Sequence, residues 1–417
     1  MSDLKSKNFW LKLDNAAKLY PAIQNSELTA VFRITAVLSD RVKIKPLMAA
    51  VSLAESRFPY FKVTLKTGVF WYYLESSDLK FKVLPDFGIP CRAFAKNELL
   101  FRLLVKENKI SVEFSHILTD GSGAFSFLKY ILSQYFRICG IEDIISKEVE
   151  LKPDKEEYED AYNRYFKRVN VSPVKQPKAF HLPFKNPVPF NVLTATIPLR
   201  QLITKAKGFE VSLTEYLTAV YLFALQNLFN RTTGFKKRRL LRIQVPINLR
   251  NIFPSRTMRN FSLFVMPGID LRLGAYTFEE IVKMVHYQMR LETDQKLIQK
   301  TMSRNVAGEK NFFVRNMPLF FKSFVISLFY AAGANQYSGV ITNYGSLKLP
   351  TAMEHRIERF YFIPPPPNKH IKVSAGMVGF KGNLIISFGS ITASKELERL
   401  FFSVLIKQGI SVKILKS

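Results

Sequence analysis

The chain is poor in cysteine, histidine and tryptophan. Its 417 residues include two cysteines, five histidines and two tryptophans. Cys91 and Cys139 match no metal-binding spacing and are too few for a disulfide framework, which favours a reducing, cytoplasmic setting. Four histidines, His181, His286, His355 and His370, have no partner at ligand spacing. We therefore expect no metal site, and only His116 has a setting that points to chemistry.

The sequence also lacks a hydrophobic run long enough to cross a bilayer. Its most hydrophobic segment, residues 324–334, is shorter than the roughly 20 residues that a spanning helix needs. Residues 1–10 contain lysines but no apolar core of signal-peptide length. With 47% hydrophobic and 13% aromatic residues, the chain can still bury large cores. We expect a soluble globular protein, for which peripheral contact with an anionic membrane stays open.

Acidic residues are scarce relative to basic ones. Sixty-one Lys and Arg residues oppose 33 Asp and Glu residues, a net charge of +28. Nine of the acids fall within residues 142–160, so the rest of the surface is more basic still. This balance favours a polyanionic partner such as a phosphorylated cofactor, an acidic carrier protein or an anionic membrane. Nucleic acid is disfavoured, because neither a known binding module nor a stripe of alternating basic and aromatic residues is present. The basic run 236–239 is either a solvated turn or a contact with phosphate or membrane.

Five prolines within residues 172–190 predict a stiff connector between two domains. The predicted organisation is an N-terminal domain of residues 1–171, the linker 172–190 and a C-terminal domain of residues 191–417. Helical patterns occur at residues 15–19, 44–56, 156–168, 199–207, 213–229, 278–300 and 392–408. Strand patterns occur at residues 30–38, 61–65, 69–74, 191–197, 240–246, 340–342, 371–378, 383–390 and 411–415. Both halves mix the two patterns in comparable order, which predicts an α/β fold with two similar layers.

His116 stands between a predicted hairpin and a predicted helix. Residues 99–106 and 110–116 are apolar runs joined by a short polar turn, and a helical pattern begins near Gly121. Thr119 or Asp120 is placed to cap that helix. A general base needs such a rigid corner, because proton abstraction depends on accurate geometry. The alternative is a buried core histidine followed by an aspartate that only caps the helix.

A series of short segments occurs in a characteristic order along the chain. They are residues 13–17 (LDNAA), 57–61 (RFPYF), 68–71 (GVFW), 116–121 (HILTDG), 245–250 (VPINLR), 259–261 (RNF) and 341–345 (ITNYG). Together they resemble alcohol acetyltransferase-like proteins of the chloramphenicol acetyltransferase and condensation-domain superfamily. Members of that superfamily carry H-x-x-x-D-G, P-x-N-x-R and S/T-N-x-G motifs. The resemblance covers nearly the whole chain.

The resemblance implies two chloramphenicol-acetyltransferase-like subdomains with mixed β-sheets flanked by helices and an active-site tunnel between them. It implies that His116 deprotonates an alcohol or amine acceptor, which then attacks the thioester of acyl-CoA. Asp120 would be structural and held by Arg250, since an arginine–carboxylate pair can fix the turn that orients the histidine. Gly121 would line the substrate pocket, and Asn343 would line it or stabilise the oxyanion. The alternative for Asn343 is a turn former beside Gly345. The expected activity is O- or N-acyl transfer with acyl-CoA as co-substrate and no bound cofactor.

Two departures from the superfamily narrow this expectation. Ser115 stands where peptide-forming condensation domains carry a second histidine, and the D-F-G-W-G signature of plant acyltransferases is absent. Both favour simple acyl transfer. Two alternatives remain: an acyl carrier protein as the donor, and a non-catalytic basic binding protein on the same scaffold.

Overall fold

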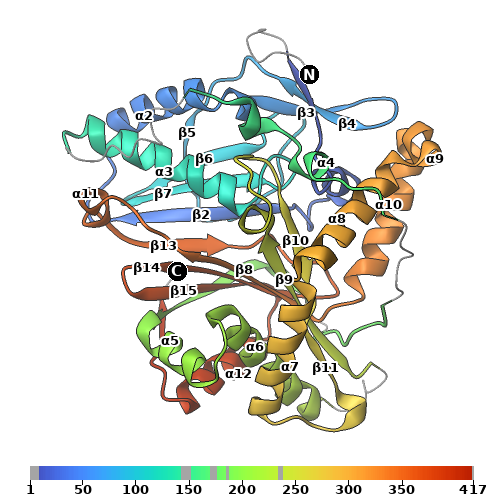
Figure 1. Ribbon diagram of the computed structural model, residues 1–417. Coiled ribbons are helices and arrows are strands. Elements are labelled where there is room, and N and C mark those ends of the chain that lie inside the picture. The colour runs from blue at the N-terminus through green and yellow to red at the C-terminus, as the bar shows by residue number, and fades with distance from the viewer. Residues whose placement is uncertain (1–8, 142–151, 170–175, 185–186, 233–237, 416–417) are drawn as a thin grey trace.

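The computed structural model describes residues 9–141, 152–169, 176–184, 187–232 and 238–415. Outside these ranges lie residues 142–151 of the acid-rich stretch 142–160, part of the linker, and Lys236–Lys237 of the basic run. The described chain forms two main mixed or antiparallel sheets, with helices packed against each of them (Figure 1). The predicted α/β class, with mixed sheets flanked by helices, is confirmed.

The N-terminal sheet has the strand order β13-β2-β7-β6-β5. Its strands are β2 (Val31–Leu38), β5 (Val83–Pro85), β6 (Phe101–Lys106), β7 (Lys109–Ser115) and β13 (Ile357–Ile363). A smaller sheet of order β1-β4-β3 adjoins it, with β1 (Trp10–Lys12), β3 (Val63–Thr67) and β4 (Tyr72–Ser76). Helices α2 (Ile44–Arg57) and α3 (Gly121–Ile138) pack against each other and against this sheet. Short helical segments are η1 (Ala17–Leu19), α1 (Tyr20–Ile23), η2 (Pro59–Phe61), η4 (Lys155–Tyr158) and α4 (Ala161–Arg164).

The C-terminal sheet has the order β10-β9-β12-β14-β15-β8-β16, with β11 paired to β9. Its strands are β8 (Pro187–Pro198), β9 (Leu240–Asn248), β10 (Ser262–Val265), β11 (Gly268–Asp270), β12 (Gly339–Ser346), β14 (Val373–Phe380), β15 (Asn383–Thr392) and β16 (Lys413–Leu415). The helices in this half of the chain are α5 (Leu199–Gly208), α6 (Leu213–Arg231), α7 (Phe278–Glu292), α8 (Gln295–Lys310), α9 (Phe312–Asn316), α10 (Leu319–Ala334), α11 (Thr351–Glu354) and α12 (Glu396–Lys407). Two 3₁₀ turns, η5 (Leu249–Asn251) and η6 (Leu271–Leu273), follow β9 and β11.

Phenylalanine forms much of the N-terminal core. Phe61, Phe101, Phe114 and Phe127 are buried and meet one another at ring-centroid distances of 5.2–5.6 Å. Edge-to-face and offset contacts of this kind add to the stabilisation from burial itself. The rings come from η2, β6, β7 and α3, so they join the helices to the sheet behind His116.

Strand β13 links the two halves of the chain. It comes from the C-terminal half, yet it pairs antiparallel with β2 at the edge of the N-terminal sheet. It also contacts β14 and β15 of the C-terminal sheet. Buried Phe360 meets Phe125 of α3 on one side and Phe380 of β14 on the other. The domain boundaries predicted from the sequence stay a prediction, but the two layers share this strand.

Three expected elements were wrong in detail. The helix predicted at 156–168 is two short pieces, η4 and α4, because Asp160 caps a new start by accepting a hydrogen bond from the Asn163 N–H. The helix predicted at 278–300 is α7 and α8, with Asp294 capping the second. The third is the end of the predicted linker 172–190, because its last four residues belong to β8. Pro187 and Pro189 lie at an end of β8 that pairs with β15 but not with β16, where a missing N–H costs little.

No helix among the described residues is long and apolar enough to cross a membrane. Cys91 is buried and Cys139 half-buried, and both are free thiols.

Candidate active site

His116 follows the last residue of β7 and sits directly before the turn into α3. The predicted hairpin is present: β6 and β7 pair from Phe101–Phe114 to Lys106–Lys109. The backbone N–H of His116 donates to the carbonyl of Ala30, which extends the pairing with β2. The ring lies between Tyr20, stacked at 5.3 Å, and Phe32, at 4.6 Å between centroids. The imidazole is therefore held by aromatic packing on both sides.

Burial dominates the electrostatics of His116. It lowers the pKa of the imidazole below the ordinary value of 6.5, because the charged form loses hydration. The Asp120 carboxylate opposes this shift but does not reverse it. Nδ1 of the ring is buried and has no hydrogen-bond partner of ordinary geometry among the described residues. The lowered pKa favours the neutral imidazole, which is the form that can accept a proton.

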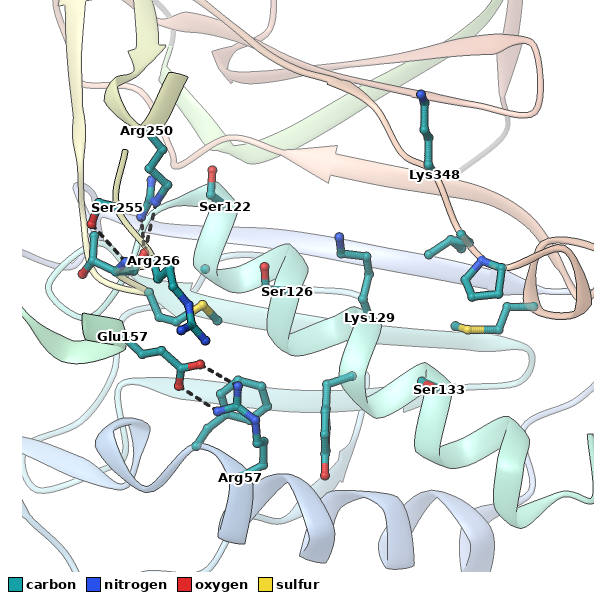
Figure 2. Close-up of a pocket in the computed structure, with 18 residues that line it drawn as sticks. Arg57, Ser122, Ser126, Lys129, Ser133, Glu157, Arg250, Ser255, Arg256 and Lys348 are labelled. Carbon is teal, nitrogen blue, oxygen red and sulfur yellow. Dashed lines mark hydrogen bonds and ion pairs between the residues drawn. The ribbon is translucent and has the colours of Figure 1, made fainter. Parts of the chain in front are cut away.

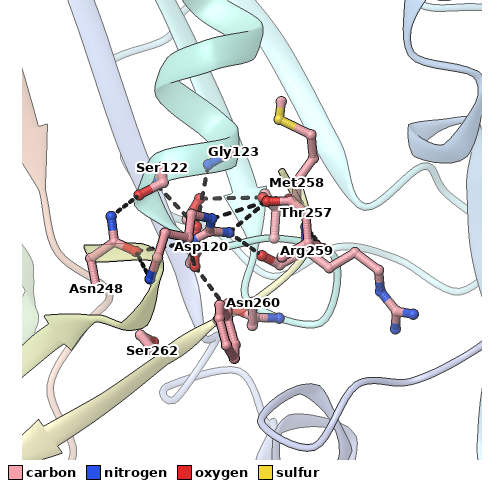
Figure 3. A network of polar contacts seen from close by, with 12 residues as sticks. Asp120, Ser122, Gly123, Asn248, Thr257, Met258, Arg259, Asn260 and Ser262 are labelled. Carbon is pink, nitrogen blue, oxygen red and sulfur yellow. Dashed lines mark hydrogen bonds and ion pairs between the residues drawn. The ribbon is translucent and has the colours of Figure 1, made fainter. Parts of the chain in front are cut away.

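Asp120, one of the two capping residues expected from the sequence, is the N-cap of α3. Its Oδ1 accepts hydrogen bonds from the backbone N–H groups of Ser122 and Gly123, at 3.0 and 3.2 Å. Its Oδ2 accepts from the backbone N–H of Phe261 at 2.9 Å and from Arg250 Nη1 at 2.8 Å. Figure 3 shows these contacts meeting at the start of the helix. Both carboxylate oxygens are occupied by structural partners, so Asp120 braces the corner that carries His116.

Arg250 ties this corner to the C-terminal half. Besides Asp120, its guanidinium donates to Asn248 Oδ1, to the carbonyl of Thr257 and to the carbonyl of Arg259. Its side chain is 13% exposed and that of Asp120 is 9% exposed. The pairing of Arg250 with Asp120 that the resemblance implied is therefore formed, in a largely buried setting.

Glycine is required at position 123, where two segments approach closely. A Cβ there would lie 2.1 Å from Thr119 Oγ1 and 2.3 Å from the carbonyl oxygen of Met258. Thr119 Oγ1 itself donates to that same carbonyl. The first turn of α3 is thus pressed against the loop that follows Arg250.

The other two predicted site residues, Gly121 and Asn343, lie on different elements, α3 and β12. Gly121 is the first residue of α3, and a Cβ there would be 3.7 Å from Phe362 and 3.9 Å from Tyr344. Asn343 lies on β12, where its Nδ2 donates to Thr214 Oγ1 at 3.0 Å. Its Oδ1 accepts from the N–H of Gly345 at 2.9 Å, which closes a local turn. No hydrogen bond joins Asn343 to His116 within the described ranges.

Sequence reasoning missed the residues that support His116 from behind. Asn260 Nδ2 donates to the carbonyl of His116 at 2.9 Å and to Asp14 Oδ2 at 3.1 Å. Burial raises the pKa of Asp14 to about 6, although Arg259 at 3.6 Å opposes the shift. Asp14 and Asn260 both lie in segments that carried the family resemblance. The pattern marked these positions, but their contact across the chain needed the structure.

A pocket of about 790 Å³ opens beside the Asp120 network. It lies between the outer face of α3, the loop after Arg250 and the segment before α11 (Figure 2). The charged and hydroxyl side chains that line it are Arg57, Ser122, Ser126, Lys129, Tyr130, Ser133, Glu157, Arg250, Ser255, Arg256, Thr257 and Lys348.

The charged side chains that line this pocket are mostly cationic. Arg57 is paired with Glu157 at 2.6 Å, and Arg256 with Asp154 at 2.8 Å. Lys129 and Lys348 form no ion pair with any described residue, and Figure 2 places Lys348 across the pocket from Arg250. The pocket therefore offers uncompensated positive charge next to the braced corner, which suits an anionic ligand.

Within the described ranges, no group of three or more His, Cys, Asp or Glu side chains is arranged to hold a metal ion.

Neither a family model nor a curated protein matches the chain in sequence. Solved structures do match in fold. The TRI101 protein of F. graminearum, solved with coenzyme A and deoxynivalenol, aligns with a TM-score of 0.67 at 10% identity, over 97% of this chain and 99% of that one. The TRI3 trichothecene 15-O-acetyltransferase of Fusarium sporotrichioides aligns with a TM-score of 0.62 at 8% identity, over 98% and 96%. The condensation domain of the monacolin K polyketide synthase MokA aligns with a TM-score of 0.61 at 12% identity, over 96% of each chain.

The chain thus has the two-subdomain fold shared by acetyltransferases and condensation domains, as the resemblance implied. At identities of 8–12%, this likeness establishes the fold alone.

The Asp120–Arg250 contact gives a test of the corner's stability. Replacing Arg250 with alanine leaves the buried Asp120 carboxylate without its charged partner, and we expect a loss of about 3 kcal/mol in the free energy of unfolding. Urea titration of Arg250→Ala against the parent protein measures it. Arg272→Ala is the matched control, since that arginine pairs with Asp270 at an exposed site and should leave the unfolding midpoint unchanged. Equal midpoints for Arg250→Ala and the parent would contradict the bracing role.

Proposed function

We propose that this protein transfers an acyl group from acyl-CoA to the hydroxyl or amine of an acceptor, with His116 as the general base. The observation that carries the proposal is the imidazole held at the end of β7 by contacts with Tyr20 and Phe32, on a corner braced by Asp120 and Arg250. The fold likeness supports it, because TRI101 was solved with coenzyme A and TRI3 is an acetyltransferase.

In the proposed reaction, His116 accepts the proton of the acceptor as its oxygen or nitrogen attacks the thioester carbonyl. A C–O or C–N bond forms, and the tetrahedral intermediate collapses by breaking the C–S bond. The imidazolium then returns the proton to the departing sulfur, so the products are the acylated acceptor and free coenzyme A. A positioned base contributes roughly 10²–10⁴-fold to such a step. Holding both substrates together removes a further part of the entropic barrier.

We assign the cationic pocket beside α3 to the phosphates of coenzyme A. Lys129 and Lys348 are the proposed contacts, because Arg57 and Arg256 already have carboxylate partners. The adjoining hydroxyls of Ser126 and Ser133 add donors suited to phosphate oxygens. An acyl carrier protein remains the alternative donor, since it delivers the same thioester without the nucleotide phosphates.

Removal of the proposed base should abolish turnover. We expect His116→Ala to lower kcat/KM by about 10²–10⁴-fold while the fold survives. Release of free thiol from a series of acyl-CoAs, with a panel of alcohols and amines as acceptors, measures the activity. His355→Ala is the control, because that histidine is exposed and does not line the pocket. Undiminished turnover by His116→Ala would refute the assignment.

The buried setting of His116 predicts the pH dependence of activity. Because burial lowers the pKa of the imidazole, the base should stay neutral to a lower pH than an exposed histidine does. The acidic limb of kcat/KM should therefore have its midpoint below 6.5. A limb centred at or above that value would contradict a buried imidazole base.

The same shift affects stability. The unfolded chain binds the proton of His116 more readily than the folded chain does, so this histidine lowers the free energy of unfolding as the pH falls below 6.5.

The pocket assignment predicts a selective effect on the donor. We expect the double variant Lys129→Ala/Lys348→Ala to raise the KM for acyl-CoA at least about tenfold with little change in kcat, since each hydrogen bond to a charged group contributes about 1.5–3 kcal/mol. The KM for an acyl-pantetheine, which lacks the nucleotide phosphates, should not change. Lys207→Ala, an exposed lysine on α5, is the control. An equal rise for both donors would place the phosphates elsewhere.

A further inference from the structure

Helices α9 and α10 expose an unusual number of aromatic side chains. The phenylalanines at positions 312, 313, 320, 321, 324 and 329 are between 60 and 80% exposed. Leu328 on α10 is 56% exposed. Contiguous apolar patches of this kind are rare on soluble proteins and mark interaction sites. We call these seven residues the Phe face.

The tip of the β3–β4 hairpin extends this surface. The backbone N–H of Leu319, at the start of α10, donates to the carbonyl of Val69 at 2.9 Å. Val69 and Phe70 at that tip are 74 and 44% exposed. Figure 1 shows α9, α10 and the β3–β4 hairpin together at one edge of the molecule. The apolar surface therefore comes from two distant parts of the sequence.

Helix α10 has one face toward the protein and one away from it. Lys322 is buried on the inner face, where its Nζ donates to the carbonyl of Phe70 and lies 3.6 Å from the centroid of the Trp71 ring. Phe320, Phe324 and Leu328 recur at helical spacing on the outer face. The inner contacts fix the helix in place, so the outer aromatic residues are presented by a rigid element.

The dimensions of α10 exclude a bilayer span but fit the bilayer interface. Its 16 residues are fewer than the roughly 20 that a spanning helix needs. They correspond to a helix roughly 24 Å long, against a hydrocarbon core of roughly 30 Å. A helix with one apolar face and one packed face can lie in the interface plane, with its aromatic side chains at the headgroup–acyl boundary.

The charges around the Phe face select an anionic partner. Residues 295–334 contain six Lys and Arg residues and one acid, Glu309. Glu309 already pairs with Lys18. Lys310 and Arg315 are exposed and flank Phe312 and Phe313. In a symmetric dimer through this face, such like charges would face one another, which disfavours a second copy.

From these contacts we propose that the Phe face and the hairpin tip dock onto an anionic lipid bilayer. The phenylalanines enter the acyl boundary, while Lys310 and Arg315 contact the phosphates of the headgroups. The inner side of α10 packs against α1, which carries Tyr20, the residue stacked on His116. The proposal stands apart from the acyl-transfer proposal, since binding requires no turnover.

Vesicle flotation with the full chain tests the proposal. We expect the protein to float with phosphatidylcholine vesicles that contain about one third phosphatidylglycerol, and much less with pure phosphatidylcholine. Phe320→Ser/Phe324→Ser/Phe329→Ser should bind at least about tenfold more weakly, with an unchanged circular dichroism spectrum. Phe87→Ser/Leu273→Ser is the matched control, because those side chains are 77 and 82% exposed outside the Phe face.

Two outcomes would overturn the proposal. The first is equal flotation of the triple variant and the parent. The second is a dimer, seen by sedimentation equilibrium without vesicles, that the triple variant abolishes while the parent fails to float. That result would assign the Phe face to a second copy of the chain.

Discussion

The ion pair between Asp120 and Arg250 is the contact on which the candidate site depends. Each partner would be costly to bury alone. Asp120 accepts from two N–H groups at the start of α3 and from the N–H of Phe261 before β10, and Arg250 donates to two carbonyls of the loop after β9. The pair joins the N-terminal helix to the C-terminal sheet. One consequence is that the orientation of His116 and one wall of the cationic pocket are set by the same interaction.

Much of this corner could be predicted from the sequence, because its signals are local. The hairpin turn, the last position of β7 and the N-cap at Asp120 all follow from residues within a short segment. The side chain at position 250 is different, since it lies 130 residues away in sequence from its partner. Only the resemblance to a known family connected the two. Periodicity and propensity describe a segment and its neighbours, and carry no information about such a distant contact.

The parts that could not be predicted are those decided by packing between distant segments. Strand β13 has an alternating burial pattern, but its place beside β2 depends on Phe360 fitting between α3 and β14. Tyr20 stacks on His116 because α1 is folded back over the end of β7. Residues 324–334 form the most hydrophobic segment of the sequence, but the pattern carries no sign of which of its side chains the fold leaves uncovered. Exposure is a property of the assembled fold.

In the fold, basic side chains gather at two separate surfaces. At the pocket beside α3, Lys129 and Lys348 are uncompensated near a rigid, partly enclosed surface, which suits a compact phosphate ligand. At the Phe face, Lys310 and Arg315 flank exposed aromatic rings on an open surface, which suits an extended, deformable partner such as a lipid bilayer. Helix α10 lies between that surface and Tyr20, so a bilayer contact would bring apolar molecules close to the corner that holds His116. In the acyl transfer proposed above, His116 would therefore stand between a pocket assigned to a phosphorylated donor and a surface proposed to meet lipid, from which an acceptor of low solubility would arrive.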